Sequence, residues 1–114
     1  MKIDIRTEGE VTIVDVEGKL TRGDGDPLLR ATVDRLLKEG RSRILLNLEK
    51  VPYMDSAGMG ELVSSAKRLS AVGGVVKLLN PMKRVFDVLH LVKLSSVFEI
   101  YHEEKAAIAS FQPR

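Results

Sequence analysis

Apolar residues recur along the chain with two different periods, and the first is typical of strands. Residues 2–6 alternate apolar and charged side chains, and residues 11–17 are rich in β-branched residues, which predicts two strands joined by a turn. Residues 44–48 form an almost unbroken apolar run, typical of a strand buried on both faces. Two further short strands are predicted over residues 75–79 and 97–100.

Helical periodicity separates the later strands. Asp26 and Pro27 predict an N-cap followed by proline at the first helical position, and apolar residues then recur at helical spacing as far as Gly40. The remaining helices are predicted over residues 56–72, 82–91 and 103–111. The order β-β-α-β-α-β-α-β-α indicates an α/β domain. Its small mixed β-sheet should combine an opening hairpin with parallel crossovers, and about four helices should surround it.

Composition narrows the class of protein. A length of 114 residues suits one domain spanning residues 1–114, with 44% hydrophobic and 30% charged residues. The absence of cysteine excludes disulfides and thiolate metal sites.

The chain lacks the apolar run of ~20 residues that membrane insertion needs, and its start lacks a signal peptide's apolar core, so we expect a cytoplasmic protein. A net charge of +2 and 4% aromatic residues argue against direct nucleic-acid binding. No pattern predicts an oligomeric state.

The candidate chemistry lies between the buried strand and the strongest helix, where residues 55–60 read Asp-Ser-Ala-Gly-Met-Gly. Glycine disfavours a helix by ~1 kcal/mol relative to alanine, so we expect the two glycines to permit the close approach of another backbone or a bulky group. One interpretation is that Asp55 or Ser56 caps the helix. A second interpretation is that Ser56 is a phosphoacceptor. The two are compatible, because a phosphate at a helix N-terminus meets free N–H groups and the positive end of the dipole, so the fold should tolerate it. A phosphate there would add roughly −1.5 to −2 charge beside Asp55 and repel a closely packed partner.

Two methionines flank this serine. If exposed, Met54 and Met59 would offer an adaptable contact surface, as methionine does at many interfaces. Met59 also falls on the apolar stripe of the predicted helix, which favours a place in the core.

Residues 53–60, placed directly after the strand over residues 44–48, resemble the signature of STAS-domain anti-sigma-factor antagonists, also called anti-anti-sigma factors. The resemblance covers essentially the whole chain. It implies a partner-switching protein, not an enzyme, that binds an anti-sigma factor which is also a serine kinase of the histidine-kinase-like ATPase type. Phosphorylation of the serine after the aspartate, Ser56 here, releases that partner, and a serine phosphatase resets the cycle. Because the nucleotide belongs to the kinase, the resemblance implies no cofactor in this chain.

The resemblance also implies a partner-binding surface. Its members would be Thr21, Asp24, Met54, Asp55, Ser56, Ala57, Gly58, Met59 and Gly60. Two positions depart from the family pattern. Ala57 stands where many members carry a second hydroxyl residue, and Thr21 stands where many carry an aspartate, followed here by a longer loop at residues 22–26. The second departure bears on the identity of the partner more than on the fold.

Other functional classes fit less well. Ser56 lacks the Gly-x-Ser-x-Gly elbow of serine hydrolases, and His90 and His102 are distant from it in sequence. The early aspartates lack the layout of a receiver domain, and dispersed histidines and carboxylates predict no metal site. The alternative within the same fold is a non-phosphorylated STAS subunit that docks to a lipid-transport ATPase or a stress-signalling scaffold. Kinase-dependent release distinguishes the two.

Overall fold

The computed structural model describes residues 1–111 and contains one five-stranded sheet with the order β1-β2-β3-β4-β5. The first two strands form the predicted antiparallel hairpin, and the later pairs are parallel. The strands are β1 (Lys2–Glu8), β2 (Val11–Glu17), β3 (Arg43–Lys50), β4 (Val75–Leu79) and β5 (Ile100–Tyr101). The prediction of an α/β fold with a small mixed sheet is confirmed.

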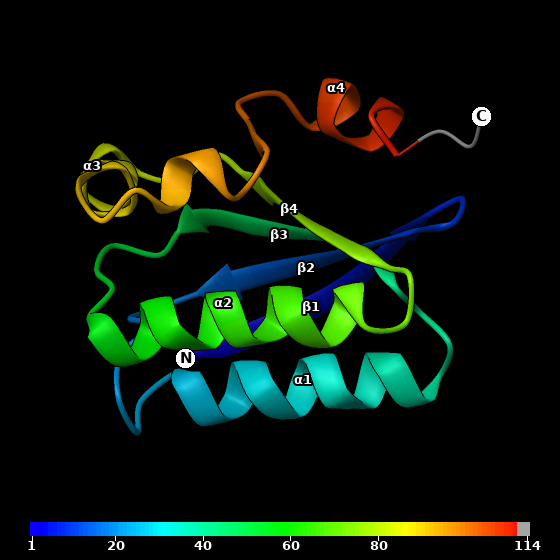
Figure 1. The fold of residues 1–114 in the computed structure, drawn as a ribbon, viewed down its shortest axis with the longest axis horizontal. Helices are drawn as coiled ribbons and strands as arrows, with labels where there is room; N and C mark the ends of the chain where they lie inside the picture. The colour runs from blue at the N-terminus through cyan, green and yellow to red at the C-terminus, as the bar shows by residue number, and fades with distance from the viewer. Residues whose placement is uncertain (112–114) are drawn as a thin grey trace.

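The helices cover the two faces of the sheet unequally (Figure 1). They are α1 (Asp26–Lys38), α2 (Ser56–Ser70), α3 (Lys83–Leu91), the 3-10 helix η1 (Leu94–Ser96) and α4 (Glu104–Ala109). Figure 1 shows α1 and α2 side by side beneath the sheet, whereas α4 lies on the opposite face. Within residues 1–111, no helix combines the length and apolar character needed to cross a bilayer.

The main core lies between the sheet and α1 and α2. Alternate residues of β3 point to this face, and the run over residues 44–48 is buried on both faces as predicted, because Leu45 joins a second, smaller cluster beneath α4. A period of two sends successive side chains to opposite faces of a sheet. The same period places Asp15 and Asn47 on the α4 face, next to the small cluster.

A buried charge network joins α1 to α2. The Glu61 side chain is 1% exposed, and its carboxylate accepts hydrogen bonds from Arg30 Nε at 3.1 Å, Ser65 Oγ at 3.0 Å and Arg68 Nη2 at 3.0 Å. Arg68 also pairs with Asp34 of α1. A buried carboxylate persists only when it is paired and hydrogen-bonded, as this one is. The network holds the two helices in one register.

Two local predictions are corrected by the structure. The strand predicted over residues 97–100 begins only at Ile100, because the N–H groups of Val97 and Phe98 both bond to the Leu94 carbonyl and keep this segment turned. The N-cap of α1 is Gly25, one residue before the predicted Asp26. The Asp26 carboxylate instead accepts the Gly23 N–H at 2.7 Å, within the loop that precedes the helix.

Candidate functional site

Ser56 is the first residue of α2, and Asp55 before it caps the helix. Asp55 Oδ1 accepts the Gly58 N–H at 2.9 Å, which satisfies one of the unpaired donors at the helix start. Asp55 Oδ2 accepts the Arg22 N–H at 3.0 Å. The backbone bond from Arg22 and the one from Gly58 lower the pKa of the Asp55 carboxyl below its usual range. Capping is therefore done by Asp55, which leaves the exposed hydroxyl of Ser56 outside the cap.

The loop between β2 and α1 is ordered against this helix start. The Thr21 carbonyl accepts the N–H groups of Asp24, Gly25 and Asp26 at 3.0–3.2 Å. Leu20, just before the loop, is joined in a parallel bridge to the segment that precedes α2, with its N–H bonded to the Tyr53 carbonyl at 3.0 Å. The two segments carry the predicted contact residues, so the fold brings Thr21 and Asp24 to the same end of the molecule as Ser56.

Gly58 explains why a small residue stands in the first turn of α2. It is buried, and a side chain here would overlap the Leu20 carbonyl oxygen and lie 2.9 Å from Met54 Cγ. The expected close approach of another backbone is therefore confirmed at Gly58. Gly60 is different, because it is exposed and a side chain there would meet nothing within 4 Å.

The remaining predicted contact residues divide by exposure. Ala57 and Met59 are half-buried, and Asp24 is exposed. Met54 is only 4% exposed and belongs to the main core, so its place on the partner-binding surface is corrected. Its side chain packs against Gly58, and its backbone forms the bridge with Leu20. Tyr53 precedes these residues and was not among the predicted contact residues, and its side chain is 45% exposed.

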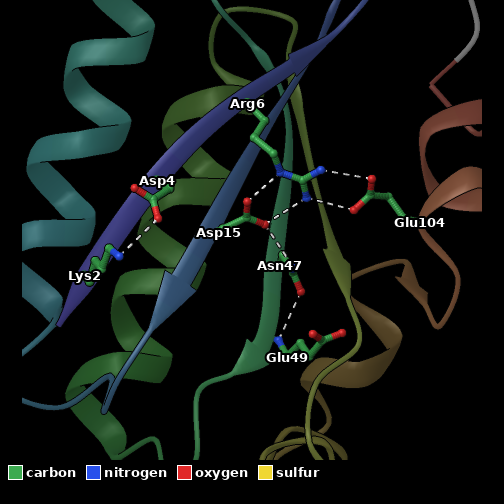
Figure 2. Close-up of polar contacts among 7 residues, drawn as sticks. All are labelled: Lys2, Asp4, Arg6, Asp15, Asn47, Glu49 and Glu104. Carbon is green, nitrogen blue, oxygen red and sulfur yellow. Dashed lines mark hydrogen bonds and ion pairs between the residues drawn. The ribbon is translucent and has the colours of Figure 1, made fainter.

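A second polar cluster lies on the α4 face of the sheet (Figure 2). Figure 2 shows the Arg6 guanidinium between Asp15 and Glu104, with Nε 2.6 Å from Asp15 Oδ2 and Nη2 2.8 Å from Glu104 Oε1. Asn47 Nδ2 donates to Asp15 Oδ1 at 2.8 Å. These bonds border a groove of 360 Å³. Because its central polar groups already pair with one another, the cluster stabilises the docking of α4.

Arg6 controls the acidity of this cluster. Its hydrogen bonds are the largest cause lowering the pKa of both Asp15 and Glu104, against the opposing effect of desolvation. The cluster thus gives the fold a charge interaction that depends on pH, at the face away from Ser56.

The sequence model of the STAS domain matches residues 2–107. The chain belongs to the STAS domain family. A relative from Thermotoga neapolitana, named as a candidate anti-sigma factor antagonist, is 36% identical over 81 residues, which cover 71% of this chain and 72% of the relative.

Solved structures of STAS proteins share the fold. The crystal structure of a candidate anti-sigma factor antagonist from Thermotoga maritima superposes with a TM-score of 0.88 and 28% identity, covering 95% of this chain and 92% of the other. The Bacillus cell fate determinant SpoIIAA, solved in its phosphorylated form, superposes with a TM-score of 0.75. At 24% identity, with coverage of 97% and 100%, the second likeness shows the fold alone.

The imidazole groups of this STAS domain lie on other elements. His90 is an exposed residue of α3, and its Nδ1 lies 3.1 Å from Ser95 Oγ in η1. His102 is exposed just before α4. The contacts that the structure gives His90 are with Ser95 and with the ring of Phe86, and not with Ser56.

Proposed function

We propose that this STAS domain is an anti-sigma-factor antagonist that releases its partner when Ser56 is phosphorylated. The observation that carries the proposal is the position of Ser56. It is exposed at the first residue of α2, while both carboxylate oxygens of Asp55 are engaged in the cap and in the loop. A kinase can thus reach the hydroxyl without breaking the cap.

The phosphate would act on the surface and leave the fold in place. It adds roughly −1.5 to −2 charge and three acceptor oxygens at a helix N-terminus, where the dipole favours an anion. The same charge beside the Asp55 carboxylate, held ionised by its lowered pKa, would repel an apolar or acidic partner surface. The proposed contact surface consists of Thr21, Asp24, Asp55, Ser56, Ala57, Met59 and Gly60, while the buried Gly58 lies beneath it and leaves room for Leu20.

The proposed partner is an anti-sigma factor that is itself a serine kinase of the histidine-kinase-like ATPase type, and a serine phosphatase restores the binding form. In this cycle the STAS domain is a regulatory, non-enzymatic cytoplasmic protein without a cofactor of its own. The relatives whose names identify them as anti-sigma factor antagonists support this assignment.

The first test is the modification state of the protein in its native host. Trypsin should release residues 51–67, which contain Ser56, and residues 69–77, which contain Ser70 as an exposed control on the same helix. We expect an added mass of about 80 Da on Ser56, for one phosphate, and none on Ser70. Unmodified Ser56 under every growth condition, in protein still bound to a transporter or scaffold, would instead support the docking subunit.

The second test is partner capture with charge variants. Ser56→Ala should keep the fold and hold the kinase under all conditions, whereas Ser56→Asp should weaken capture. Ser70→Asp adds the same charge at the far end of α2 and should bind like the wild type. Equal binding by Ser56→Asp and Ser70→Asp would contradict an electrostatic switch at Ser56.

A further inference from the structure

The loop at residues 22–26 brings a cation to the start of α2, where Ser56 lies. Arg22 is exposed, and its backbone N–H donates to Asp55 Oδ2 at 3.0 Å. Within residues 1–111, its guanidinium takes part in no ion pair or side-chain hydrogen bond. The positive charge of Arg22 also contributes to the lowered pKa of Asp55, which places that charge near the start of α2.

The guanidinium of Arg22 has the reach to meet a group on Ser56. Five bonds of roughly 1.5 Å separate its Cζ from its Cα, so the head explores a radius of up to roughly 6 Å around a backbone fixed at Asp55. Ser56 is the next residue along the chain. Arg30, the first cation of α1 along the chain, is already paired with the buried Glu61 carboxylate, with Nε 3.1 Å from Oε1.

We propose that Arg22 is the intramolecular ligand of the phosphate on Ser56. This inference rests on the proposed function, because it assigns a partner to the phosphate that the switch adds. A guanidinium binds phosphate through two parallel N–H···O bonds, and such charge-assisted bonds are stronger than neutral ones. The Arg22 backbone is held by Asp55, so pairing orders only the side chain.

Pairing gives the switch two effects. Phosphorylation adds a negative charge to the contact surface, and it also withdraws the Arg22 cation from any carboxylate that a partner offers. The loop is suited to this role because Thr21, next to Arg22, is neutral, whereas a carboxylate at that position would repel the phosphate.

The test uses protein with phosphoserine encoded at position 56, so that no kinase is needed. The second pKa of a phosphoserine lies near 6, and a neighbouring cation lowers it by favouring the dianion. A ³¹P NMR titration at low salt should show that the phosphate pKa is about 0.5 higher in Arg22→Gln than in the wild type. The shift is moderate because the site is exposed. Any residue but proline keeps the backbone N–H, so the loop should stay in place. Arg22→Lys should give an intermediate value.

Arg84→Gln provides the matched control, since Arg84 is an exposed arginine of α3 and its loss changes the net charge equally. An equal phosphate pKa in wild type and Arg22→Gln, or an equal shift in Arg84→Gln, would overturn the inference. The titration tests the role of Arg22 whether or not cells phosphorylate Ser56. An absence of phosphate on Ser56 in cells would overturn the proposed function and leave the titration result unchanged.

Discussion

Replacing Gly58 with alanine should force apart the two segments that form the candidate site. The new methyl group would overlap the Leu20 carbonyl oxygen and press on Met54 Cγ at 2.9 Å. Leu20 cannot move aside freely, since its N–H bonds to the Tyr53 carbonyl and its own carbonyl accepts the Asp55 N–H at 3.3 Å. To relieve the clash, the loop that carries the contact residues would have to shift away from α2 and strain or break these bonds.

The sign of the effect follows from two opposing terms. Alanine is favoured over glycine in a helix by about 1 kcal/mol, whereas overpacking typically destabilises by ~1–3 kcal/mol. A clash with backbone at Gly58 belongs at the upper end of that range, so the variant should lose about 2 kcal/mol of unfolding free energy. For a chain of this length the loss lowers Tm by about 8 °C.

Gly60→Ala is the matched control, because the same methyl group two residues later meets nothing within 4 Å. It should gain up to about 1 kcal/mol from helix propensity alone. Urea unfolding followed by circular dichroism measures both variants. If Gly58→Ala proves as stable as Gly60→Ala, the close approach of Leu20 to α2 is absent in solution, and the account of this glycine is wrong.

The charge clusters give two further predictions. Asp15 and Glu104 have pKa values lowered by Arg6, so the stability that they contribute is present above the ordinary carboxyl pKa near 4 and is lost as pH falls below it. Arg6→Met should therefore reduce the loss of stability at acidic pH, measured by urea unfolding at pH 2–7. An unchanged loss would contradict the role of Arg6. Glu61→Ala should lower the free energy of unfolding by about 3 kcal/mol, because it removes the buried centre of the α1–α2 network. Glu39→Ala, at an exposed ion pair, should change it by less than about 1 kcal/mol in the same assay. Similar losses in the two variants would show that the buried network stabilises the fold no more than an exposed ion pair does.

Local sequence information was enough for the element order and for much of the site. The apolar periods place β2 and β4 at their predicted bounds, and α2 at its predicted start. Gly73, with φ of 78°, ends α2 in the left-handed conformation that glycine favours. The sequence predicted that either Asp55 or Ser56 caps α2, and the structure shows that Asp55 does. Such a cap can be predicted locally because it joins residues only a few positions apart.

The sequence by itself determined the strands, the helices and the presence of a small-residue segment around Ser56, because these depend on periodicity and on contacts between near neighbours. Only the tertiary structure decided that Met54 is core, that Gly58 makes room for Leu20 and that Arg22 is bound to Asp55. Each of these depends on the packing of the β2–α1 loop against the start of α2. Arg22 and Asp55 are separated by 33 positions in the chain. No local pattern encodes such a contact, because it exists only once the parallel pairing of β2 with β3 has brought both segments to one edge of the sheet.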